Sequence, residues 1–140
     1  MIILAISLCI LIAVIFLVVN INKNKKDIIK MDTNYINTNY EIDLFADKKE
    51  NNLELYSVGK YLGSDKFAED PKIKITVNCM YTYTDADEQY TDMLSEDIVL
   101  TKDDSNYNGK ANINLNRNEV DGYSCYYIIK DTTGSYFKKD

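Results

Sequence analysis

Residues 72–84, KIKITVNCMYTYT, contain the clearest strand pattern in the chain. Apolar or aromatic residues and one cysteine occupy every second position, namely Ile73, Ile75, Val77, Cys79, Tyr81 and Tyr83. The positions between them carry mostly Lys, Thr and Asn. Because successive side chains of a strand point to opposite faces, this alternation predicts a strand with one face in the core and the other in water.

Residues 86–99 follow this strand and have the pattern of an amphipathic helix. Asp85, followed three residues later by Glu88, resembles a capping box at a helix start. An apolar stripe then recurs at helical spacing, formed by Tyr90, Met93, Leu94 and Ile98. A helix with such a stripe packs it against a sheet.

Further strands are expected on both sides of this pair. Alternating or β-branched and aromatic residues predict strands within 39–45, 53–63, 110–120 and 123–130. Asp121-Gly122 predicts a tight hairpin between the last two, because a two-residue hairpin loop needs the positive φ that glycine adopts freely. The fold class expected from these elements is α+β, an antiparallel sheet flanked by a helix.

The first 19 residues, MIILAISLCILIAVIFLVV, contain no charged side chain. A helix of about 20 apolar residues crosses a bilayer, and no small-residue cleavage site follows this stretch. We therefore expect a transmembrane anchor over residues 1–22, a juxtamembrane stalk over 23–38 and a folded domain over 39–140. The lipid bilayer is then the partner of residues 1–22.

The orientation of this anchor has two interpretations. Lys23, Lys25, Lys26 and Lys30 all follow the apolar stretch, and the positive-inside rule applied literally places the domain in the cytoplasm. The lack of any basic residue before the stretch would also arise if the natural start lay upstream. We favour a single-pass protein of the cell membrane with an extracytoplasmic domain.

Composition and charge exclude several functions. The chain has a formal net charge of −6, and the residues after Lys30 include 12 basic and 21 acidic ones, which disfavours nucleic acid as a partner. No histidine is present, which removes the usual general base and most zinc sites. The sequence thus predicts no catalytic residues, no cofactor and no metal site.

Two acidic segments resemble cation sites. DSNYNG (104–109) opens like a calcium loop, but the twelfth position, where the loop needs a glutamate, is Leu115. Six carboxylates within 85–97 are more simply the solvated face of the expected helix. Catalysis by these carboxylates, or a weak cation site among them, remains the alternative.

Cys79 and Cys125 are the cysteines outside the apolar N-terminal stretch. Both lie on the expected inner faces of strands, so they are candidates for a disulfide, which forms in oxidising compartments. Two buried free thiols are the alternative.

The chain has 12 tyrosines, several of them within the expected strands. Tyrosine combines an apolar ring with a polar hydroxyl and suits contact surfaces. The candidate contact surface consists of Tyr81, Tyr83, Tyr123, Tyr126 and Tyr127. Ordinary packing between neighbouring strands is the alternative.

The order of these elements resembles PsbP-like domains, the relatives of the extrinsic photosystem II protein found in membrane-anchored proteins of low-GC Gram-positive bacteria. The resemblance depends on the strand with Tyr40, Ile42 and Leu44, the strand from Ile73 to Tyr83, the expected helix, and VDGYSCYYI (120–128). It implies an α-β-α sandwich and an extracytoplasmic domain, with no shared active site. The sequence ends before the closing strand and second helix of that fold.

The function expected from the sequence is a membrane-anchored extracytoplasmic binding or assembly module of unknown ligand, with a protein partner at the cell surface. It is not expected to be an enzyme. The alternatives are a carboxylate- or cation-dependent hydrolase and a cytoplasm-facing regulatory domain.

Overall fold

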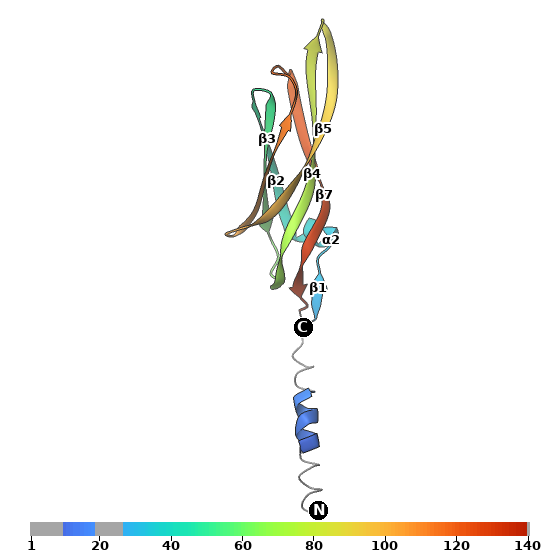
Figure 1. The fold of residues 1–140 in the computed structure, drawn as a ribbon, viewed down its shortest axis with the longest axis vertical. Helices are drawn as coiled ribbons and strands as arrows, with labels where there is room; N and C mark the ends of the chain where they lie inside the picture. Colours follow the sequence, from blue (N-terminus) through green and yellow to red (C-terminus); the bar gives the residue numbers. More distant parts are fainter. Residues whose placement is uncertain (1–9, 19–26, 140) are drawn as a thin grey trace, which may run out of the picture.

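The computed structural model describes residues 10–18 and 27–139, and the domain that they form is built almost entirely of antiparallel strands (Figure 1). Its elements are β1 (Ile28–Lys30), α2 (Thr33–Asn39), β2 (Tyr40–Lys49), β3 (Asn52–Tyr61), β4 (Phe67–Asp85), β5 (Glu88–Asp103), β6 (Asn106–Asn114) and β7 (Gly122–Phe137). Hydrogen bonds join the strands in the order β1-β7-β4-β5-β6-β3-β2.

The long strand β5 belongs to both halves of this sheet. Its residues Glu88–Leu100 pair with β4, whereas only Thr101–Asp103 pair with β6. The sheet folds over at this point, so that two half-sheets face each other. We call them the β4 half-sheet (β1, β7, β4 and most of β5) and the β3 half-sheet (the end of β5, β6, β3 and β2).

Gly109 permits close contact at the fold-over. A Cβ at this position would lie 2.8 Å from the carbonyl oxygen of Val99 and would also overlap the side chain of Ile98. Real Cβ atoms do not approach other atoms so closely. A residue with a side chain would therefore push β6 away from β5.

The core lies between the two half-sheets and receives one face of each strand. The alternation in β4 buries Ile73, Ile75 and Val77, and Leu53 and Leu55 of β3 belong to the same buried cluster. The intervening residues lie on the outer faces of both half-sheets and are mostly polar, with exposed exceptions such as Phe45, Met80 and Tyr126.

The helix α2 closes one end of the core. Asp32 caps its start by accepting a hydrogen bond from the backbone N–H of Tyr35 at 2.8 Å, and Ile36 is completely buried. Strand β1 pairs with the end of β7. The folded unit thus includes residues of the expected stalk as well as residues 39–139.

The expected α+β fold class is wrong, because the region assigned to a helix is strand β5. The stretch 85–88 is a tight turn with Ala86 at φ 51° and Asp87 at φ 67°, and Asp85 pairs with Glu88. Two central residues at positive φ give the hairpin turn that matches strand twist. Since β5 continues the sheet, the domain is not an α-β-α sandwich of the PsbP-like type.

The hairpin expected at Asp121-Gly122 is also absent from the described residues. Strands β6 and β7 belong to different half-sheets and are not neighbours in the sheet order. Gly122 instead lies opposite Thr82 of β4, and the N–H of Asp121 donates to the carbonyl of Thr82 at 2.7 Å. The connection from β6 therefore crosses from one half-sheet to the other.

The expected transmembrane helix and single-pass membrane localisation are contradicted. Among the described residues, no helix combines the length and apolar character that a membrane crossing needs. Residues 10–18 of the expected anchor are helical. Residues 1–9 and 19–22 lie outside the described part of the chain.

Candidate binding site on the outer face of the β3 half-sheet

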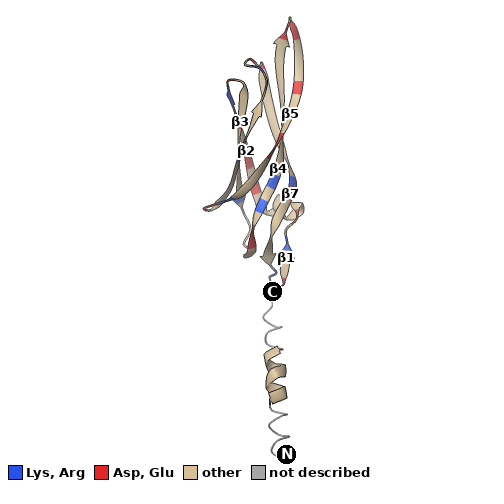
Figure 2. Cartoon of the chain, viewed as in Figure 1, with Lys and Arg blue, Asp and Glu red and all other residues tan. Residues whose placement is uncertain are grey.

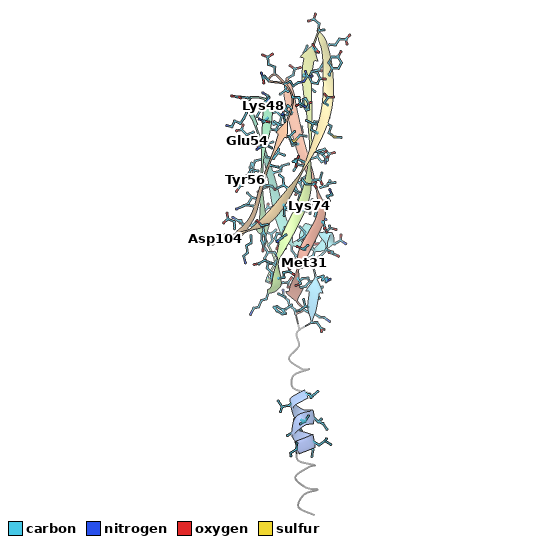
Figure 3. All side chains as sticks on the ribbon, viewed as in Figure 1. Met31, Lys48, Glu54, Tyr56, Lys74 and Asp104 are labelled. Atoms are coloured by element: carbon cyan, nitrogen blue, oxygen red, sulfur yellow. A yellow bond between two sulfur atoms is a disulfide. The ribbon has the colours of Figure 1, made fainter. Side chains whose placement is uncertain are left out.

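A hollow of about 670 Å³ lies on the outer face of the β3 half-sheet. Its lining comes from β2, β3, β6 and the end of β5, and consists of Phe45, Ala46, Asp47, Glu54, Leu55, Tyr56, Asp103, Asn108, Lys110, Ala111 and Asn112. The two labelled residues Glu54 and Tyr56 lie along β3 in Figure 3. The register of the three strands arranges the outward side chains in rows across the sheet.

The central row of the hollow is aromatic and basic. Phe45 lies opposite Tyr56, which in turn lies opposite Lys110. The two rings are stacked with centroids 6.2 Å apart, and the Lys110 ammonium lies 5.5 Å from the centroid of the Tyr56 ring. Phe45 is 55% exposed, so it presents a large apolar surface to solvent.

The next row is acidic. Asp47 lies directly opposite Glu54, and Asn112 lies opposite Glu54 on the other side. Like charges at directly opposite positions destabilise a sheet. Lys49 forms an ion pair with Asp47 at 3.0 Å, and this hydrogen-bonded pairing, aided by the charges of Asp47 and Glu54, raises the pKa of the lysine.

The row on the other side of the aromatic pair is polar. Asn108 donates from Nδ2 to Asp103 at 3.2 Å, and its Oδ1 is 3.4 Å from the Tyr56 hydroxyl, which donates to it. The hollow thus offers aromatic faces, carboxylates and amides on regular strands whose backbone is held by the sheet. Such a combination binds ligands that have both an apolar part and polar groups.

The five tyrosines of the candidate contact surface do not form one surface. Tyr81 is buried in the core, and Tyr83 lies beneath the guanidinium of Arg117, whose Cζ is 3.2 Å from the ring centroid. Tyr126 is exposed on the outer face of the β4 half-sheet. Tyr123 and Tyr127 have a different role, described next.

Tyr123 and Tyr127 extend from β7 to the outer edge of β2. The Tyr127 hydroxyl donates to the carbonyl of Ile42 at 3.1 Å, and the Tyr123 hydroxyl donates to the carbonyl of Ala46 at 3.2 Å. Strands β7 and β2 have no backbone pairing with each other. The two hydroxyls therefore occupy acceptors that a further strand would use at an open sheet edge.

Cys79 and Cys125 lie directly opposite each other in β4 and β7 and form a disulfide in the structure. Their Cα atoms are 4.1 Å apart. The bond faces the core, where Cys79 is completely buried. It joins two cysteines that are 46 residues apart in sequence.

The carboxylates within 85–97 are spread along the β4–β5 hairpin, away from the hollow. Figure 2 shows acidic residues at the tip of this hairpin and basic residues along the middle of β4. Asp97 is paired with Lys74 and Lys130, each at 3.0 Å. Within residues 10–18 and 27–139, no group of three or more Cys, Asp or Glu side chains is arranged to hold a metal ion.

The residues that line the hollow are not among the candidate site residues predicted from the sequence. The signal that points to them is Phe45, an aromatic residue on the outward face of β2, where Glu41, Asp43 and Asp47 are its neighbours. The resemblance to PsbP-like domains finds no support in the comparisons. Neither the models of known families, nor curated proteins, nor solved structures give a match to this chain.

Proposed function

We propose that this domain is a binding module whose ligand site is the hollow on the outer face of the β3 half-sheet. The observation that carries the proposal is the exposed aromatic pair Phe45 and Tyr56 at the centre of a hollow lined by charged and amide side chains. Neither side chain belongs to the hydrophobic core cluster or packs against it. Binding sites on strands are also more rigid than sites on loops.

The alternatives from the sequence have weaker support. A carboxylate-dependent hydrolase would use the acidic residues within 85–97, and their positions along an exposed hairpin provide no enclosed site. A regulatory domain needs a ligand or partner surface as well, and the hollow would be its first candidate.

A library of small charged, neutral and aromatic compounds tests the proposal by ligand-observed NMR. We expect several compounds to bind the wild type and to lose binding to a Phe45→Ala/Tyr56→Ala variant. The matched control is Met80→Ala/Tyr126→Ala, which removes two exposed side chains from the outer face of the β4 half-sheet. Equal binding to all three proteins, or loss only in the control variant, would overturn the proposal.

A further inference from the structure

We propose that the hollow binds a basic peptide segment, with a lysine or arginine side chain over Phe45 and Tyr56 and its charge next to Asp47 and Glu54. This inference rests on the proposed function and adds the chemical class of the ligand. It follows from the charge of the hollow, from its aromatic surface and from the amides that flank them.

The charge of the hollow favours a cation. Three carboxylates line it, those of Asp47, Glu54 and Asp103, against the single ammonium of Lys110. Glu54 forms no ion pair among the described residues, although it lies directly opposite Asp47. Lys49, paired with Asp47 at 3.0 Å, offsets part of the repulsion between these two carboxylates, and a second cation beside Glu54 would reduce what remains.

The aromatic pair favours a cation on an apolar stem. Lys110 already lies over the Tyr56 ring, which shows that the ring accepts an ammonium group. No cation lies over Phe45 in the part of the chain that the structure describes. A lysine or arginine stem would cover this exposed ring while the charged end reaches the carboxylates.

The amides favour a peptide over an isolated amine. Asn108 and Asn112 flank the aromatic row on opposite sides, and each side-chain amide can both donate to and accept from a peptide group. The volume of about 670 Å³ accommodates several residues of an extended chain. The hollow crosses three strands, so a peptide can meet the aromatic, acidic and amide rows together.

Calorimetric titration with hexalysine at low ionic strength, where exposed charges are least screened, tests this inference. We expect hexalysine to bind, whereas fully acetylated hexalysine and hexaglutamate do not. Asp47→Asn/Glu54→Gln should weaken hexalysine binding about three- to thirtyfold, since two exposed charge contacts are lost. Asp87→Asn/Glu96→Gln lowers the net negative charge equally on the distant β4–β5 hairpin and should change the affinity less than about twofold.

A second variant tests whether the ligand is a cation, because removing Lys110 should strengthen the binding of a cation and weaken that of an anion. Lys110→Gln removes the resident cation from Tyr56, and we expect hexalysine to bind about two- to fivefold more tightly. Lys60→Gln, on the same strand as Tyr56 but outside the hollow, is the matched control and should have a smaller effect. A neutral or anionic ligand would instead lose a donor and bind Lys110→Gln more weakly.

Three results would overturn the inference: absence of hexalysine binding, equal effects of the two doubly neutralised variants, or weaker binding to Lys110→Gln. If the hollow binds only neutral or anionic compounds of the library, the basic-peptide inference fails and the proposed function stands. If hexalysine binds and the Phe45→Ala/Tyr56→Ala variant binds it equally well, the site itself is wrong.

Discussion

The disulfide between Cys79 and Cys125 should contribute a large share of the stability of this domain. It closes a loop with a sequence separation of 46 residues. In the chain-entropy model, closing a loop of this length removes about 13 cal/mol/K from the unfolded chain, or about 4 kcal/mol at room temperature. Folded proteins of this size are typically stable by about 5–15 kcal/mol, so reduction should remove much of that margin.

Urea denaturation with and without a phosphine reductant measures this contribution. With a slope of about 1–2 kcal/mol per M urea, the midpoint should fall by about 2 M or more on reduction. The slope should also rise, because the reduced unfolded chain exposes more surface. Cys79→Ala/Cys125→Ala is the control, and its midpoint should be low in both conditions and insensitive to the reductant.

A large stabilisation by the disulfide is refuted if the reduced wild type unfolds within about 0.5 M urea of the oxidised protein. That result would mean that residual structure already restricts the unfolded chain without the covalent bond, or that the bond does not form. Titration of free thiols in the denatured protein distinguishes the two explanations.

Three further predictions concern single side chains and are measured by urea or thermal unfolding. Tyr127→Phe should lower the free energy of unfolding by about 0.5–1.5 kcal/mol, because the Tyr127 hydroxyl donates to a β2 carbonyl at 3.1 Å. Tyr126→Phe should have no effect, and equal losses in the two variants would contradict the contact between Tyr127 and the edge of β2. Gly109→Ala should lower the free energy of unfolding by about 1–3 kcal/mol, because its Cβ would overlap β5. Gly122→Ala, whose Cβ would make only an ordinary contact of 3.7 Å with the Thr82 hydroxyl, should be neutral or slightly stabilising, and similar losses in both variants would disprove the close approach at Gly109. Hydrogen bonds from a threonine hydroxyl and two lysines hold the pKa of Asp97 well below its ordinary 3.8, so its stabilisation is present above that value and is lost as the pH falls. The stability difference between wild type and Asp97→Asn should be largest at neutral pH and shrink below about pH 4, and a difference independent of pH would refute this account.

Strands with a strict two-residue period could be predicted from the sequence. The strands expected at 72–84 and 123–130 lie within β4 and β7, and the strand expected at 39–45 matches β2 except for Asn39, the last residue of α2. In each case one face is buried against the opposite half-sheet, so burial imposes the alternation directly on the residues.

The β4–β5 hairpin could not be predicted in the same way, because its pattern depends on partners distant in sequence. Met93 lies on an outer face opposite Met80, and Tyr90 stacks on Tyr83 across the hairpin. These cross-strand pairs place apolar residues on both faces of β5, and their spacing imitates a helical stripe. The turn at Ala86 and Asp87 also lacks the glycine that normally identifies such a hairpin.

The hollow could not be predicted from the sequence, because the order of the strands in the sheet brings its residues together. Phe45 and Tyr56 belong to consecutive strands, but Lys110 comes from β6, which pairs with β3 only after the chain has passed through β4 and β5. No local sequence pattern specifies that pairing. The feature of the sequence that points to the hollow is Phe45, an aromatic residue between Asp43 and Asp47 on the solvent-exposed face of β2.

Backbone amide chemical-shift mapping with hexalysine tests the central claim most directly, because it locates the ligand without changing the protein. The largest shifts should fall on the strands around the hollow, near Phe45, Glu54, Tyr56 and Lys110, and should saturate together. Shifts concentrated on the outer face of the β4 half-sheet, or spread over all acidic residues without saturation, would contradict this claim.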